Sequence, residues 1–284
     1  MEIKTFFDEQ TFTLTHVIYD ASSGDAVVID PVLDFDPIAW SLHESSLTRL
    51  NEFITSKKLK LHYVVDSHIH ADHVTGMQYF KERYSVPLVI NSAICKVQST
   101  FKNILGMPKS FKVDGSQFDI LVKDGDVLKA GSFGLEVITT PGHTPACTTY
   151  KIADNLFTGD AIFNPDVGTG RCDFPNGSAH DLFNSVTKKI YTKPDATKIF
   201  PGHDYPGSRQ LHTQTTVGEN KKHNADLPAS RSEQDYVEFM QQRDARLPNP
   251  KLIYQSVQLN INAGVMPEAE ENGMRYLKIP IKKS

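Results

Sequence analysis

The chain has 284 residues, of which 39% are hydrophobic and 23% are charged, and its formal net charge is −4. This composition is typical of a globular protein with a sizeable core. The small negative charge, spread without long runs, argues against a dedicated surface for nucleic acid or an anionic membrane. The N-terminal residues lack the pattern of a secretory signal, and no apolar run is long enough for a membrane helix, so we expect a cytoplasmic protein.

Alternating and apolar runs predict the secondary structure of the first third of the chain. The predicted elements are strands at 12–18 and 26–30, a helix at 44–57, a strand at 61–66, a helix at 74–84 and a strand at 87–90. A tight polar turn at Ser23-Gly24-Asp25 joins the first two strands as a hairpin. Because strands and helices then alternate, we expect the later strands to pair in parallel, in an α/β arrangement.

The middle of the chain favours short strands, and its end favours helices. The predicted elements are strands at 118–122, 135–140, 148–152 and 155–158, a helix at 179–191, a strand at 197–200 and a helix at 233–246. No internal repeat and no linker rich in Gly, Ser or Pro divides the chain. We therefore predict one domain over residues 1–284, with a core at about 10–210 and a helical and extended C-terminal tail at 211–284.

The segment from Ser67 to Gly76 carries the strongest functional signal, because three histidines and one aspartate stand within six positions after an apolar strand. These four residues are His68, His70, Asp72 and His73. Imidazole and carboxylate groups are the ligands expected for zinc, iron or manganese. A solvated histidine-rich turn explains one or two histidines, but so dense a cluster is costly to fold unless something binds it. The segment therefore predicts a metal site.

Three further candidate ligands follow predicted strands, each beside a glycine. They are His143 after the strand at 135–140, Asp160 after the strand at 155–158 and His203 after the strand at 197–200. In sheets with helical connections, functional groups gather at strand ends. Glycine lets the backbone turn sharply or approach a metal closely. Together these positions predict one site built from several strand ends.

Spacing alone leaves the number of metals open. His68 and His70 are two residues apart, so an extended backbone points both to one side. Asp72 and His73 follow where the chain bends toward the next helix. This pattern fits two adjacent metals bridged by Asp160. It equally fits one metal held by two histidines and a carboxylate, as in non-haem iron oxygenases.

The order His68-x-His70-x-Asp72-His73, then His143, Asp160 and His203, resembles the metallo-β-lactamase superfamily. The resemblance runs from Asp30 to His203 at least. It implies an α+β fold, an αββα four-layer sandwich that holds its metals at one edge of two sheets.

Within that superfamily the chain most resembles the persulfide (sulfur) dioxygenases, which are sisters of glyoxalase II. The segments that carry this resemblance are 67–76, 141–145, 157–161, 170–174 and 202–205. The tail from Gln210 onward is similar to a bacterial subgroup called β-lactamase-hydrolase-like proteins. Two departures are Cys172, where the familiar dioxygenases often carry threonine, and Ala146, which replaces a common glycine.

The resemblance implies oxidation of glutathione persulfide by O2 to sulfite and glutathione. In that family one Fe(II) per chain is held by residues matching His68, His143 and Asp160. The remaining candidates, His70, Asp72, His73 and His203, would then either support the ligands from around the metal or lie beside its open face.

The alternative that the resemblance leaves open is a glyoxalase II-like thioester hydrolase containing one or two Zn(II). In its two-metal form His68, His70 and His143 would hold one zinc, Asp72, His73 and His203 would hold the other, and Asp160 would bridge them.

Arg171 and Tyr205 are candidate substrate-binding residues. The alternative for Arg171 is to pair with Asp173 and order its loop, and the alternative for Tyr205 is to pack beside His203. Cys172 either takes part in the chemistry or is a packed thiol. A glutathione persulfide or a related thiol conjugate is the expected partner, without nucleic acid or membrane, and a symmetric homodimer is a reasonable expectation.

Overall fold

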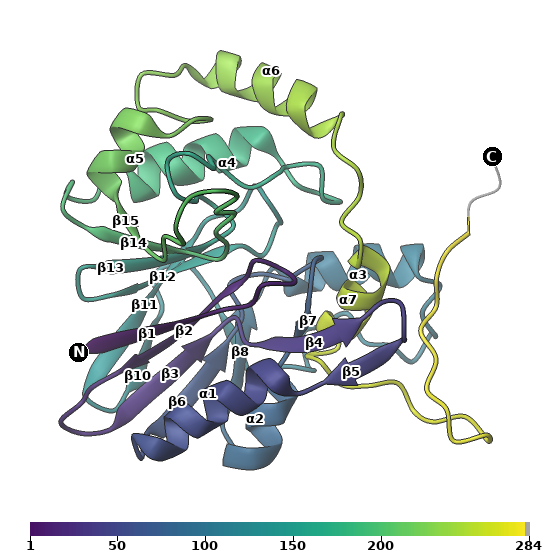
Figure 1. Ribbon diagram of the computed structural model, residues 1–284. Coiled ribbons are helices and arrows are strands. Elements are labelled where there is room, and N and C mark those ends of the chain that lie inside the picture. The colour runs from purple at the N-terminus through teal and green to yellow at the C-terminus, as the bar shows by residue number, and fades with distance from the viewer. Residues whose placement is uncertain (282–284) are drawn as a thin grey trace.

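Two six-stranded β-sheets pack face to face in the computed structural model, which describes residues 1–281 (Figure 1). The first sheet has the order β1 (Glu2–Phe7), β2 (Leu14–Tyr19), β3 (Asp25–Ile29), β6 (Lys60–Val65), β8 (Leu88–Asn91), β9 (Ile120–Val122). The second has the order β10 (Val127–Ala130), β11 (Phe133–Thr139), β12 (Thr148–Ile152), β13 (Asn155–Gly159), β14 (Lys198–Pro201), β15 (Thr215–Thr216). A smaller sheet joins β5 (Ser41–His43), β4 (Val32–Asp36) and β7 (Val74–Thr75).

Apolar side chains from both large sheets meet in the space between them. The first sheet contributes Ile18, Val27, Ile29, Val65 and Val89, and the second contributes Leu135, Val137, Tyr150, Phe157 and Phe200. All of these side chains are buried. Removing this much apolar surface from water is the main force that holds the two sheets together.

Helices cover the outer face of each sheet. On the first sheet these are α1 (Ser45–Ser56), α2 (Met77–Tyr84) and α3 (Ile94–Ile104), which bury residues such as Leu50, Phe80 and Phe101. On the second sheet they are α4 (Ala179–Ser185), a π-helical turn (Val186–Ile190), α5 (Val217–His223) and α6 (Glu233–Asp244). The layer order is helix, sheet, sheet, helix, which confirms the αββα fold.

Strand pairing also follows the prediction. The hairpin of β2 and β3 is antiparallel, and β6 pairs in parallel with both β3 and β8. The helix expected at 74–84 begins only at Met77, because the N–H of Gly76 donates to the carbonyl oxygen of Pro31 at 2.7 Å. The two residues before Gly76 are extended and form β7, which pairs with β4.

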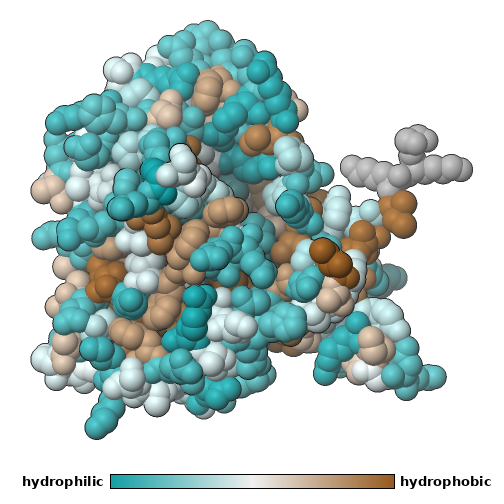
Figure 2. All heavy atoms as spheres, viewed as in Figure 1, coloured by the Kyte–Doolittle hydropathy of each residue, from teal (hydrophilic) through white to brown (hydrophobic). Residues whose placement is uncertain are grey.

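The C-terminal segment returns to the first sheet. Helix α7 (Ile253–Asn260), which sequence patterning did not predict, buries Val257 against the same apolar cluster as α1 and α2. After α7 the chain is extended, and Met274 and Tyr276 on it are exposed. Figure 2 shows hydrophobic residues on this segment, beside a mostly hydrophilic face. None of the helices formed by residues 1–281 is long and apolar enough to cross a membrane.

Candidate metal centre

Strands from both large sheets end at one edge of the sandwich and carry the residues singled out in the sequence. His68 follows β6 of the first sheet. His143, Asp160 and His203 follow β11, β13 and β14 of the second sheet. All four side chains are buried. The structure therefore places these residues at strand ends, as expected. Residues from the two sheets meet at one site.

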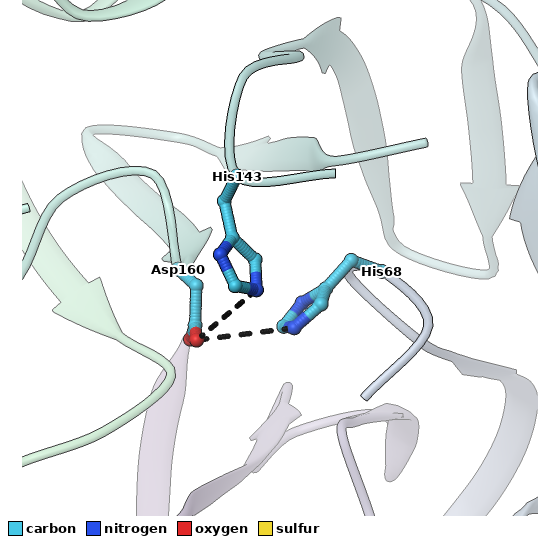
Figure 3. A group of neighbouring side chains, drawn as sticks. All are labelled: His68, His143 and Asp160. Atoms are coloured by element: carbon cyan, nitrogen blue, oxygen red, sulfur yellow. Dashed lines mark ion pairs between the residues drawn. The ribbon is translucent and has the colours of Figure 1, made fainter. Parts of the chain in front are cut away.

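His68, His143 and Asp160 form one group of donor atoms, all within 4.8 Å of one another. Oδ2 of Asp160 lies 3.9 Å from Nε2 of His68 and 3.7 Å from Nε2 of His143, and Figure 3 shows both rings turned toward the carboxylate. These distances are too long for hydrogen bonds. Because a metal lies about 2.0–2.2 Å from nitrogen and oxygen ligands, two donors to one ion are separated by about 3–4 Å. The spacing fits such an ion.

Hydrogen bonds leave the inward-facing nitrogen of each histidine in this group free. Nδ1 of His143 donates to the carbonyl oxygen of Arg171 at 2.6 Å. Since a carbonyl oxygen only accepts, Nε2 of His143 must carry the lone pair. Nδ1 of His68 lies 3.0 Å from Oγ of Ser67, and its buried Nε2 has no hydrogen-bond partner among the described residues. An orphaned buried nitrogen is costly unless a ligand satisfies it, so this donor set fits a metal.

A second group of donors consists of His70, Asp72 and His73, whose atoms also lie within 4.8 Å of one another. His70 directs Nε2 at Oδ1 of Asp30, 3.1 Å away, so only its Nδ1 remains free. His73 has Nδ1 3.1 Å from Oδ2 of Asp72, and its Nε2 has no hydrogen-bond partner within residues 1–281. The structure therefore separates the predicted ligands into two adjacent clusters.

His203 lies between the two clusters. Its Nε2 is 3.5 Å from Oδ1 of Asp160 and 3.6 Å from Oδ2 of Asp72. Burial alone would lower the pKa of His203, but the Asp160 and Asp72 carboxylates raise it above the ordinary value. Burial, followed by the charges of neighbouring histidines, lowers the pKa values of His68 and His70 well below the ordinary value. These two histidines are therefore neutral, which is the form that binds metal.

Two glycines allow the strand ends to approach closely. Gly159, directly before Asp160, has a φ of 49°, and a Cβ there would lie 2.4 Å from Oγ of Ser67. At Gly202 a Cβ would lie 2.7 Å from Oδ1 of Asp160. Any side chain at either position would displace the groups around the carboxylate. The predicted role of glycine beside the candidate ligands is therefore confirmed at these positions.

A cleft of about 380 Å³ opens onto both donor clusters, with Asp72, His143 and Asp160 in its lining. Phe163 and Tyr205 form part of its wall. The Tyr205 ring stacks on the imidazole of His203, with 5.6 Å between centroids and 13° between planes, and 45% of the residue is exposed. Tyr205 therefore packs beside His203 and still faces solvent in the cleft.

The guanidinium of Arg171 is engaged by the protein itself. Its Nε and Nη2 each donate to the Asp173 carboxylate at 2.6 Å, and its Nη1 donates to the carbonyl oxygen of Pro248 at 2.8 Å. This is the loop-ordering role offered by the sequence as the alternative to substrate binding. Arg171 nevertheless lies in the lining of the cleft.

The cysteines near the site are protonated at neutral pH. Burial raises the pKa of Cys147 to about 12. Burial, followed by the Asp244 carboxylate, raises the pKa of the half-buried Cys172 still further. Since the thiolate is the reactive form of cysteine, both thiols behave as packed side chains.

Sequence reasoning missed two buried residues that hold the histidine segment. Asp30 accepts from the backbone N–H of Ser67 at 2.6 Å as well as facing His70. Asn260, at the end of α7, donates to the carbonyl oxygens of His70 and His73, both at 2.9 Å. Asp30 follows an apolar strand, and that signal could have found it. Nothing in the local sequence marks Asn260.

Comparison with known proteins gives a consistent set of relatives. Residues 10–203 match the family described as the metallo-beta-lactamase superfamily. A protein of Xylella fastidiosa named beta-lactamase hydrolase-like protein is 40% identical over 98% of this chain, which spans 64% of that relative. The mitochondrial persulfide dioxygenase ETHE1 of Homo sapiens is 34% identical over 93% of this chain and 89% of its own length. The crystal structure of ETHE1 from Myxococcus xanthus is 32% identical, with a TM-score of 0.75 over 93% of this chain and 100% of that one.

Proposed function

The chain belongs to the metallo-beta-lactamase superfamily, whose related members are metal-dependent enzymes, and from this we propose that it is a non-haem iron persulfide dioxygenase. Its reaction is the oxidation of glutathione persulfide by O2 and water to sulfite and glutathione. The proposed ligands of one Fe(II) are His68, His143 and Asp160.

One observation carries the proposal, namely that two histidines and one carboxylate surround a common point while His70 lies outside their group. The Asp30 carboxylate faces Nε2 of His70 and holds its ring among a different set of donors. Two histidines and a carboxylate on one face are the ligand set of non-haem Fe(II) oxygenases. The relatedness to a persulfide dioxygenase supports the same chemistry.

Bound Fe(II) would supply an open face for a soft sulfur donor and the one-electron chemistry that O2 requires. The protein holds the donor atoms in place and shapes the path by which the substrate reaches them. The carboxylate of Asp160 places negative charge where it favours the oxidised ion. Phe163 and Tyr205 line the cleft that leads to this carboxylate, and their rings would shield a bound sulfur from water.

A specific observation also favours the thioester hydrolase with two zinc ions. His70, Asp72 and His73 form a second group of donors beside the first, and His203 lies within 3.6 Å of carboxylate oxygens in both groups. Two adjacent metals would share a water of lowered pKa, which could attack a thioester carbonyl.

Metal analysis combined with two activity assays distinguishes the two functions. The metal content of protein purified with and without O2 is measured first. O2 uptake with glutathione persulfide is then compared with hydrolysis of S-lactoylglutathione. We expect one iron per chain and O2 uptake. Two zinc ions per chain, thioester turnover and no O2 uptake would contradict the proposal.

Two substitutions sharpen this test. His68→Ala removes a ligand in either enzyme, so the dioxygenase should lose its iron and the two-metal enzyme should lose one of its two zinc ions. His203→Ala removes a ligand only from the two-metal enzyme, so the iron should stay bound to the proposed dioxygenase. Metal content per folded chain is the measurement. A His203→Ala protein that loses half of the metal of the wild type would favour the hydrolase.

A further inference from the structure

Among the described residues, the His143 ring has one hydrogen-bond partner, a backbone carbonyl oxygen. Nδ1 of His143 donates to the oxygen of Arg171 at 2.6 Å, which fixes both the tautomer and the tilt of the ring. Metal-binding histidines generally hold their second nitrogen in this way, and the partner tunes the strength of metal binding. Groups that fix the backbone around Arg171 therefore also help to fix the orientation of the His143 ring, and with it the direction of Nε2.

The end of helix α6 holds that backbone. The guanidinium of Arg243 donates to the carbonyl oxygens of Thr169 and Gly170, each at 3.2 Å. The carboxylate of Asp244 accepts from the N–H of Cys172 at 2.6 Å. The residues on both sides of Arg171 are thus tied to two adjacent side chains of the C-terminal part of the chain.

A second carboxylate completes the arrangement. Nη1 of Arg243 donates to Oδ2 of Asp226 at 2.6 Å, and the same oxygen accepts from the N–H of Thr169 at 2.8 Å. Nε of Arg243 donates to Asp244 at 2.9 Å. Both carboxylates are buried, with 8% and 5% of their side chains exposed, so these charge-assisted bonds are poorly screened by solvent.

We propose that Arg243 and Asp244 are positioning residues of the metal centre, which act on His143 through the backbone of residues 169–172. The inference rests on metal binding at His143, which the proposed dioxygenase and the alternative hydrolase share. It assigns part of the metal affinity to a helix that begins at Glu233, beyond the residues 10–203 that match the family.

The test uses Arg243→Gln, with Arg231→Gln as the matched control. Both arginines lie over the ring of Phe239, at 4.3 Å for Arg231 and 5.9 Å for Arg243, and both donate to Asp226. Of the two arginines, only Arg243 donates hydrogen bonds to residues 169–172 within the described part of the chain. The measured quantities are the dissociation constants of Zn(II), and of Fe(II) without O2, by competition with a chelator. The unfolding temperature of each metal-free protein is measured alongside.

We expect Arg243→Gln to weaken the binding of both metals by about 10-fold, the lower end of the effect of losing a direct partner, because the bond from His143 to the Arg171 carbonyl stays in place but is held less firmly. Arg231→Gln should lower the unfolding temperature of the metal-free protein while its metal affinity stays that of the wild type. Arg243→Lys keeps the positive charge but lacks the planar guanidinium with its several donors, so the metal affinity of this variant should be intermediate. This variant also provides the test if Arg243→Gln does not fold.

Equal metal affinities for the wild type and Arg243→Gln, or an equal loss of affinity in Arg231→Gln, would overturn the inference. Failure of the proposed function gives a different result. In that case O2 uptake is absent from the wild type, while the difference in Zn(II) affinity between the two variants remains.

Discussion

His16 is a buried histidine outside the metal centre that links the stability of the fold to pH. Its Nε2 lies 3.0 Å from the carbonyl oxygen of Pro201, and its Nδ1 lies 3.0 Å from Oγ1 of Thr5. Because a carbonyl oxygen only accepts, Nε2 carries the proton and Nδ1 accepts from the threonine hydroxyl. Burial lowers the pKa of His16 to about 4. In the folded protein His16 is therefore neutral at neutral pH.

The pH dependence of folding should reflect this histidine. Its folded pKa of about 4 lies below the ordinary value of 6.5, so the unfolded chain binds more protons between these values. The contribution of His16 to stability is complete above pH 6.5 and is lost as the pH falls toward 4. Between pH 7.5 and 5.5 the loss of unfolding free energy is on the order of 1 kcal/mol.

Urea unfolding of the wild type and His16→Gln at pH 7.5 and 5.5 measures this contribution. Glutamine can still donate to Pro201 and accept from Thr5, but it does not titrate. Every other group contributes equally in both proteins, so the difference between their pH dependences isolates His16. Identical loss of unfolding free energy in the two proteins would contradict the assignment.

At the scale of elements, helix α7 supports the histidine segment from a distant part of the chain. The Asn260 amide donates to the carbonyl oxygens of His70 and His73, and its Oδ1 accepts from the N–H of Thr75 at 2.9 Å. The residue is fully buried, and both polar atoms of its side chain have hydrogen-bond partners. Gln98 on α3 is equally buried and donates to the carbonyl oxygen of Ile261 at 2.9 Å, without touching the histidines.

Replacing Asn260 should therefore loosen the histidine segment. Asn260→Ala leaves buried backbone groups without partners, which costs about 2 kcal/mol or more. Hydrogen exchange of the peptide covering residues 66–76 should become faster. Gln98→Ala, the control, should lower the unfolding free energy while exchange in that peptide stays as in the wild type. Faster exchange in both variants would mean that Asn260 only stabilises the fold.

The same helix shows where sequence reasoning reaches its limit. The cluster at His68 and the candidate ligands after β11, β13 and β14 could be predicted because ligand chemistry and strand ends are local patterns. The comparisons confirm the family branch that the sequence resembles. The contact between Asn260 and His70 joins residues 190 positions apart, so no local pattern contains it. Helix α7 was missed for a related reason, since its buried face includes Ser256, Gln258 and Asn260 beside its apolar residues.

The proposed metal ligands come from both large sheets of the molecule. His68 belongs to the end of β6 in the first sheet, while His143 and Asp160 follow strands of the second sheet. An ion held by all three would join the two sheets at their edge, in addition to the apolar layer between them. The metal would therefore stabilise the fold as well as serve the reaction.

Removal of the metal should lower the unfolding temperature. An ion present at a hundred times its dissociation constant stabilises the folded state by about 2.7 kcal/mol, and each kcal/mol corresponds to about 2–4 °C for a chain of this size. We expect calorimetry of the metal-loaded and chelator-treated proteins to differ by about 5–10 °C. His68→Ala should show no such difference, because it lacks the ligand from the first sheet. The control is His62→Ala, because His62 lies on β6, the strand that precedes His68, and pairs with Asp25 at 2.6 Å; this variant should respond to the chelator as the wild type does. A chelator effect that persists in His68→Ala would place the stabilising ion elsewhere in the protein.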